Sequence, residues 1–414
     1  MVNGALGGKR IAAQALGTTA LVALLAVAAF SSTAAGAESA ASSGWRPSEP
    51  PPRPGPIVPP SRDEIERAVR RGRDFLLKTQ NKNGSWGSVQ VNRPGEVYAP
   101  VPGAHHAFRA ATTALCLSAL IELGEASPEV DSAIDRGEQW LLAHLPHLRR
   151  ATPDAIYNTW GHAYGIAALA LLAGRRPGDR HRAEEIRRQL QQQLDCLQRY
   201  ECVDGGWCYY DFNAHTQRPS GSTISFVTAA VLTALSDARP AGLAPPERLV
   251  QRALDSMRRQ RKPDFSYLYG EYLKYRPMRL INRPAGSLGR SQACNLAMRL
   301  WGDPAITDEV LTTWLDRLFA RNLWLDIGRK RPIPHEAYFQ VAGYFFYFGH
   351  YYAARCIEQL PPPVRPRYQD YLAHVLTSLQ ESDGSWWDFP LYDYHQQYGT
   401  AFALMSLVRC RRAP

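Results

Sequence analysis

RGRDFLLKTQNKNGSW, at residues 71–86, is an amphipathic segment that ends in Gln80-x3-Gly84-x-Trp86. This ending recurs once strictly and once loosely, at Gln380-x3-Gly384-x-Trp386 and at Gln198 followed by Gly205-Gly206-Trp207. Glutamine can bond backbone groups, glycine permits a tight turn, and tryptophan covers the joint. We therefore expect each copy to tie the end of a helix to the turn that follows it, within an internally repeated chain.

Six helical hairpins of roughly 50 residues each follow one another after Ser61, and each contains an amphipathic helix, a polar and aromatic loop, and an Ala- and Leu-rich helix. The first helices are expected at Asp63–Gln80, Ala126–Leu145, Gly178–Tyr200, Pro245–Lys262, Thr307–Trp324 and Val364–Ser382. The second helices are expected to begin near His106, Gly161, Thr223, Ser287, Tyr338 and His395.

The two kinds of helix differ in how their apolar residues are arranged. The second helices are apolar nearly all round and must be buried on all sides, whereas the first helices carry one charged face. An inner ring covered by an outer ring satisfies both patterns, so the sequence predicts an all-α fold, an α6/α6 toroid. The inner helices would run parallel, with their N-termini and the long loops before them at one mouth.

These repeats resemble the QW repeats of the squalene–hopene and oxidosqualene cyclases, whose α/α toroid is shared by the protein prenyltransferases. The resemblance covers residues 61–414 and implies a central pocket for an isoprenoid-like ligand. Two catalytic signatures of those proteins are missing, the Asp-x-Asp-Asp acid of the cyclases and the Asp-x-Cys zinc pair of the prenyltransferases. Tyr394-His395 resembles the Tyr-His that precedes the last zinc-binding segment of the prenyltransferases, which makes zinc a candidate cofactor and His395 its candidate ligand.

Titratable side chains gather in or just after the loops that lead to inner helices. The candidate catalytic residues are Asp393, His395, Glu336 and His335, with Asp393 or Glu336 as the proton donor or metal ligand. The candidate ligand-binding residues are His105, His106, His162, Tyr210, Asp211 and Arg290. Imidazoles with carboxylates suit zinc, and the same groups suit proton abstraction from a sugar acid. Capping of helices and filling of an aromatic mouth, without chemistry, is the alternative interpretation.

The fifth repeat is unusually aromatic, with Tyr or Phe at 338, 339, 344–348, 351 and 352. These rings cover more than one helix face, so we expect some to line the central cavity, where they could hold an isoprenoid or stabilise a cation. Ordinary packing between the two rings of helices is the alternative.

The N-terminus has the order of a secretory signal. Lys9 and Arg10 precede an apolar run over residues 11–30, and small residues end at Ala37. We expect a signal peptide at 1–37 and a Pro-rich linker at 38–60, hence a periplasmic or extracellular protein. The apolar run is long enough to remain as an uncleaved anchor, and membrane contact is expected through this segment only.

The net charge of +10 comes from scattered basic residues, which is typical of solvated helix faces and does not predict nucleic-acid binding. Phosphate-binding loops, dinucleotide fingerprints, nucleophile elbows and His-Glu-x-x-His helices are absent from the sequence. The leading hypothesis is an exported toroid that binds an isoprenoid-like ligand. The alternatives are a secreted polysaccharide lyase or hydrolase, and a non-catalytic interaction module.

Overall fold

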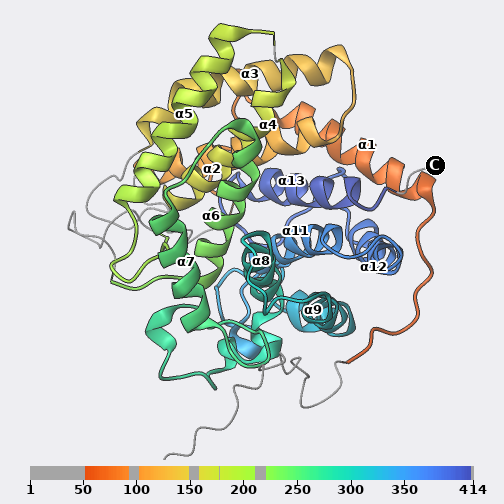
Figure 1. The fold of residues 1–414 in the computed structure, drawn as a ribbon. Helices are drawn as coiled ribbons and strands as arrows, with labels where there is room; N and C mark the ends of the chain where they lie inside the picture. Colours follow the sequence, from red (N-terminus) through yellow and green to blue (C-terminus); the bar gives the residue numbers. More distant parts are fainter. Residues whose placement is uncertain (1–51, 93–101, 149–157, 177, 210–220, 412–414) are drawn as a thin grey trace, which may run out of the picture. The chain divides into compact units, whose positions relative to one another are not determined.

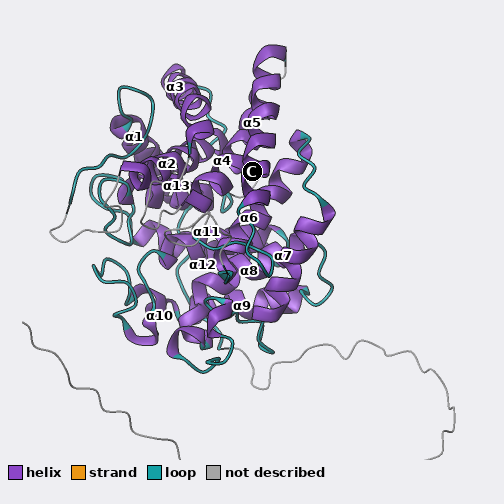
Figure 2. Cartoon of the chain, turned by 90° about the vertical axis from the view of Figure 1, so that its left-hand side faces the viewer, coloured by secondary structure: helices purple, strands orange, loops and turns teal. Residues whose placement is uncertain are grey.

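The computed structural model describes residues 52–92, 102–148, 158–176, 178–209 and 221–411. Twelve helices of this part form two rings (Figure 1, Figure 2). The inner helices are α2 (Pro102–Glu122), α4 (Asn158–Arg175), α6 (Ser225–Ala238), α8 (Leu288–Leu300), α11 (Phe345–Glu358) and α13 (His395–Val408). The outer helices are α1 (Arg62–Thr79), α3 (Pro128–His144), α5 (Arg180–Arg199), α7 (Glu247–Gln260), α9 (Asp308–Ala320) and α12 (Arg365–Ser378). No strand is formed by the residues described; their ladders are limited to isolated bridges.

Burial separates the two rings as the sequence pattern predicts. Nearly every residue of α6 is buried, whereas α7 buries one side and exposes the other. Each inner helix contacts the next one along the chain, and α13 contacts α2, so the inner ring closes. The all-α toroid of six helical hairpins is therefore confirmed.

The fifth inner helix begins later than expected. α11 starts at Phe345 and not near Tyr338, because residues 338–340 form a short 3-10 turn, η6 (Tyr338–Gln340). Phe339 and Gln340 have φ of 60° and 55°, which a right-handed helix cannot contain. A five-residue helix, α10 (Asn322–Asp326), lies between α9 and this turn.

The repeated Gln–Gly–Trp turns make the contacts expected of them. In the last copy the Gln380 amide donates to the carbonyls of Gly384 and Ala68, both at 2.9 Å, and the Trp386 indole donates to the Leu376 carbonyl at 2.8 Å. Arg71 donates to the Gln380 side chain at 3.1 Å. Because Arg71 lies on α1 and Gln380 follows α12, this turn joins the last repeat to the first.

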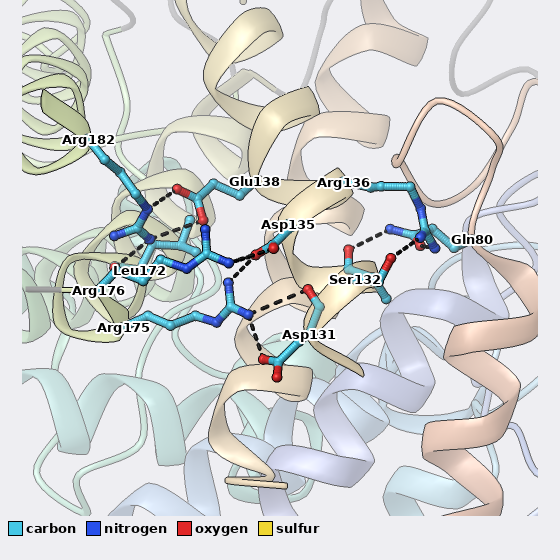
Figure 3. A network of polar contacts seen from close by, with 11 residues as sticks. Gln80, Asp131, Ser132, Asp135, Arg136, Glu138, Leu172, Arg175, Arg176 and Arg182 are labelled. Carbon is cyan, nitrogen blue, oxygen red and sulfur yellow. Dashed lines mark hydrogen bonds and ion pairs between the residues drawn. The ribbon is translucent and has the colours of Figure 1, made fainter. Parts of the chain in front are cut away.

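Ion pairs join the outer helix α3 to α4 and α5 (Figure 3). Arg175, at the end of α4, binds Asp131 at 2.6 Å and also Asp135. Arg182 of α5 pairs with Glu138, and both side chains are buried. A second guanidinium bond, from Arg182 to the Leu172 carbonyl at 2.8 Å, fixes α5 against the end of α4.

Two features concern the N-terminal region. Residues 52–60, the last part of the predicted linker, precede α1, and the Tyr371 hydroxyl of α12 donates to the Gly55 carbonyl at 2.8 Å. The signal segment 1–37 lies outside the described residues. Within the described ranges, none of the helices combines the length and the apolar character that a membrane crossing requires.

Candidate ligand-binding site

A cavity of about 310 Å³ lies inside the inner ring. This volume is at the lower end of the roughly 300–1,000 Å³ of small-molecule pockets. Twelve of its lining residues are aromatic, namely Phe108, Trp160, Tyr164, Tyr209, Phe226, Tyr269, Tyr344, Phe345, Phe348, Phe389, Tyr398 and Phe402. The other lining residues are Ala111, Thr112, Leu115, Pro334, His335 and Leu391. No carboxylate, lysine or arginine is among these described lining residues.

The aromatic rings of the wall pack mainly edge to face. Phe226 of α6 lies 4.9 Å from Phe345 and 5.9 Å from Phe348, with interplanar angles near perpendicular. Phe348 also contacts Phe402 of α13. Tyr344, Phe345 and Phe348 confirm that part of the aromatic fifth repeat lines the cavity. The other aromatic residues of α11 are buried, whereas Tyr338, in the turn before this helix, is exposed.

Hydroxyl groups form a chain along one part of the wall. The Tyr209 and Tyr269 hydroxyls are hydrogen-bonded, Tyr269 lies 3.4 Å from the Tyr344 hydroxyl, and Tyr344 lies 3.1 Å from His335 Nε2. His335 Nδ1 lies 2.7 Å from the Gln340 carbonyl, which requires a proton on Nδ1 and leaves Nε2 as the acceptor of a neutral ring. Burial lowers the pKa of His335, in agreement with a neutral imidazole.

Arg290 supports this polar part of the wall from behind. Its guanidinium lies 5.4 Å from the rings of both Tyr269 and Phe345 and is fully buried. It donates to the carbonyls of Gly286 at 2.8 Å and Ile281 at 2.7 Å. Burial lowers the pKa of Arg290, and the bonds to carbonyls and the aromatic faces replace the carboxylate that such a buried cation usually has.

A buried carboxyl group contacts another residue of the cavity wall, the tyrosine Tyr398. Asp388 accepts a hydrogen bond from the Tyr347 backbone N–H at 2.9 Å and another from the Tyr398 hydroxyl at 2.8 Å. Tyr398 lines the cavity, whereas Asp388 lies behind it. Burial is the main cause that raises the pKa of Asp388 to about 7. The sequence interpretation missed this residue because a single Asp after two tryptophans matches no motif.

The four predicted catalytic residues do not come together. His335 is in the cavity wall, and Glu336 beside it is exposed. The Asp393 carboxylate accepts from the Ser88 hydroxyl at 2.9 Å, and His395 Nδ1 lies 2.6 Å from the Tyr392 carbonyl. Asp393 and His395 are thus part of the junction between the first and last repeats, outside the cavity wall.

The predicted ligand-binding residues are similarly dispersed. His105 Nδ1 lies 3.2 Å from the Tyr394 hydroxyl, and His106 Nε2 lies 3.1 Å from the His144 carbonyl. His162 is buried between α4 and α5, where its Nδ1 lies 2.7 Å from the Gln193 amide oxygen and burial lowers its pKa to about 4. Tyr210 and Asp211 lie outside the described residues. No group of three or more His, Cys, Asp or Glu in the described ranges has the geometry of a metal site, including the surroundings of His395.

The chain is an α/α-toroid protein, and its similarities in sequence and structure to known proteins support this class. No family model matches it. A squalene–hopene cyclase of Schizosaccharomyces japonicus is 28% identical over 116 residues, which are 26% of this chain and only 16% of the cyclase. This match supports the resemblance to the squalene cyclase repeat.

Solved structures share the whole fold. The type II terpene cyclase MstE from Scytonema has 16% identity and a TM-score of 0.50, over 84% of this chain and 98% of the cyclase. The GH76A α-1,6-mannanase from Salegentibacter sp. HEL1_6 has 8% identity and a TM-score of 0.52, also over 84% of this chain and 98% of the mannanase. The toroid is thus common to terpene cyclases and glycoside hydrolases, and the content of the cavity must distinguish between such functions.

Proposed function

We propose that the central cavity binds an apolar, isoprenoid-like ligand. The observation that carries the proposal is the wall itself, which is built of twelve aromatic side chains and no described charged group. Such a surface favours transfer of an apolar chain out of water, and ring faces also accommodate carbon–carbon double bonds and cationic centres. The similarity to a squalene–hopene cyclase points to the same ligand class.

The wall argues against the glycan-processing alternative. Most glycoside hydrolases use two carboxyl groups that flank the scissile bond. None of the described lining residues is Asp or Glu, and the buried acid Asp388 is connected to the cavity wall through the Tyr398 hydroxyl. The proposal concerns binding, and the hydroxyls of Tyr209, Tyr269, Tyr344 and Tyr398 are the groups that would orient a polar end of the ligand.

Ligand binding can be measured by fluorescence energy transfer. Trp160, in the cavity wall, is a donor, and a conjugated polyene fatty acid bound in the cavity is the acceptor. We expect farnesol and geranylgeraniol to displace the polyene, and α-1,6-mannobiose to have no effect. Ala111→Trp places an indole in the cavity and should weaken binding at least about tenfold, because it fills volume that the ligand needs. Ala143→Trp adds the same side chain at an exposed position of α3 and should bind normally.

Either of two results would refute the proposal: displacement by mannobiose but not by farnesol, or equal affinity of the two Trp variants. Trp160→Phe separates binding from its signal, because this variant should lose part of the energy transfer and keep the part from the other nine tryptophans. Farnesol binding, measured by retention of radiolabelled ligand, should persist.

We further propose that the chain is exported by its first 37 residues, since charged, apolar and small residues follow one another there in the order of a signal peptide. The intact mass of the chain recovered from the producing cell tests this: a mature N-terminus at Glu38 supports cleavage, and a full-length chain recovered from the cytosol contradicts export.

A further inference from the structure

The polar part of the cavity wall is a row of three hydrogen bonds. They join Tyr209 to Tyr269, Tyr269 to Tyr344, and Tyr344 to Nε2 of His335. All four side chains line the cavity, and all four come from segments between helices: after α5, between α7 and α8, and before α11. We call these four residues the hydroxyl chain.

The direction of the hydroxyl chain is set at His335. Its Nδ1 lies 2.7 Å from the Gln340 carbonyl and must carry the ring proton, because a carbonyl only accepts. In a neutral ring Nε2 is then an acceptor, so the Tyr344 hydroxyl donates to it. Each phenol has a single proton. Tyr269 therefore donates to Tyr344, and Tyr209 donates to Tyr269.

This direction depends on two protonation states, and burial supports both. Burial lowers the pKa of His335, and the charges of Arg290 and Arg279 lower it further, so the ring is neutral at neutral pH. Burial raises the pKa of Tyr269, so its phenol keeps its proton. Three hydroxyl protons then serve three hydrogen bonds, and the hydroxyl chain has no proton left to donate to a ligand.

We propose that the ligand of the cavity is a terpenoid alcohol, whose hydroxyl group donates to the oxygen of Tyr269. This inference rests on the proposed binding of an isoprenoid-like ligand and adds the chemistry of its polar end. The Tyr269 oxygen accepts one bond within the hydroxyl chain and keeps a second lone pair. A hydroxyl that itself donates is also a stronger acceptor. An aldehyde or an ether only accepts, and the hydroxyl chain offers it no proton.

The charges around this site argue against an anionic end group. None of the described lining residues is Lys or Arg. The buried Arg290 lies behind Tyr269, 5.4 Å from its ring, and donates to the carbonyls of Gly286 and Ile281. A carboxylate or phosphate would leave water without direct contact to a cation, and removing such a charge from water costs far more than removing an alcohol.

Farnesol and farnesal test the inference, because they share one carbon skeleton and only the alcohol can donate. Competition with radiolabelled farnesol retained by the full-length protein gives relative affinities. Farnesyl methyl ether is a second compound that only accepts, and farnesoic acid is the anionic analogue. We expect farnesol to bind about fivefold tighter than farnesal or the ether, the contribution of one hydrogen bond.

Two substitutions locate the donor preference in the hydroxyl chain. Tyr269→Phe removes the acceptor, so the preference for farnesol over farnesal should disappear. His335→Asn suits the left-handed backbone of this residue, with φ of 67°, but its side chain is too short to replace Nε2. The Tyr344 proton then becomes available, and farnesal should gain affinity relative to farnesol.

Tyr371→Phe is the matched control. It makes the same chemical change on α12, where the hydroxyl donates to the Gly55 carbonyl and does not line the cavity. This variant should keep the fivefold preference of wild type. Thermal unfolding of each variant verifies that the fold is intact.

Three results would overturn the inference and leave the proposed function in place. One is equal binding of farnesol, farnesal and the ether by wild type. Another is tighter binding of farnesal or farnesoic acid, which would assign the polar end to a donor such as the Trp160 indole. The third is a farnesol preference that persists in both Tyr269→Phe and His335→Asn. If none of the four compounds binds, the proposed function itself is refuted, and this inference with it.

Discussion

At the scale of single residues, Asp388 combines a helix-capping role with a shifted protonation equilibrium. One carboxyl oxygen accepts from the Tyr347 N–H in the first turn of α11, and the other accepts from Tyr398 in the cavity wall. Burial outweighs these bonds and raises the pKa of Asp388 to about 7. Folded chains therefore keep this proton at pH values at which the unfolded chain has released it.

The sign of the pH effect follows from this proton. From about pH 4, the ordinary pKa of Asp, up to about pH 7, the folded state holds one more proton than the unfolded state, so the contribution of Asp388 to stability falls as pH rises. Asp388→Asn keeps an acceptor and cannot ionise, so wild type should lose stability relative to this variant across that range. Urea unfolding at several pH values measures the difference, and parallel curves would contradict the assignment.

His162 and His350 also change the pH dependence of stability, so the effect of Asp388 must be measured as the difference between wild type and the Asp388→Asn variant. Burial lowers the pKa of each to about 4. Between about pH 4 and pH 6.5 these histidines are protonated in the unfolded chain but neutral in the folded one. Their contributions to stability therefore rise with pH, which is opposite to the effect of Asp388.

Sequence alone located the residues of the site only in part. Its place in a loop before an inner helix predicts His335 as a site residue, and His335 is in the wall. The same rule predicts Asp393 and His395, which lie in a junction between repeats. A loop position does not fix the direction of a side chain, since the turn geometry sets it. The left-handed backbone of His335, with φ of 67°, is such a local feature.

At the scale of elements, the turns between outer and inner helices show both what a motif predicts and where it fails. A fourth turn of the same shape follows α7, where the Lys262 N–H donates to the Ser266 carbonyl at 2.8 Å as Asn81 does to Ser85 at 2.9 Å. In this copy Phe265, at φ of 60°, occupies the place of the glycine, and Tyr267 that of the tryptophan. The sequence pattern does not reveal this copy, because Arg261 stands in the place of the glutamine and all three signature residues are therefore replaced.

Gly384 gives a direct test of the turn. A Cβ at this residue, with φ of 92°, would lie 2.5 Å from the Arg71 carbonyl oxygen, so Gly384→Ala must displace the backbone of α1. Gly124 also has a positive φ, of 65°, but has open space around it. We expect Gly124→Ala to cost about 1 kcal/mol and Gly384→Ala clearly more, as measured by urea unfolding. Equal losses would show that the contact with α1 does not constrain the turn.

At the scale of the whole molecule, ion pairs and a hydrogen bond join the first repeat to the last. Arg409 after α13 pairs with Glu122 of α2, and Arg411 pairs with Glu66 of α1 at 2.9 Å. The Gln380 turn adds its bond to Arg71. The sixfold hairpin pattern predicted this closed ring, because helices that are apolar all round have no stable place in an open array.

The ring also explains why the cavity wall was harder to predict than the fold. Its residues come from α2, α4, α6, α11 and α13 and from the long loops between helices, and every repeat contributes at least one. Helical periodicity identifies a buried residue but does not distinguish the face toward the central cavity from the face toward the outer ring. His162 shows this, because it lies on an inner helix and bonds outward to Gln193 of α5.

The central claim, that the toroid encloses a pocket for an apolar ligand, is tested most directly by native mass spectrometry of the purified full chain after incubation with a total lipid extract. Wild type and Ala143→Trp should each retain one isoprenoid or comparable lipid, and Ala111→Trp should retain none. A wild-type chain that emerges without lipid, or one that carries a saccharide, would contradict the claim, as would equal retention of lipid by Ala111→Trp.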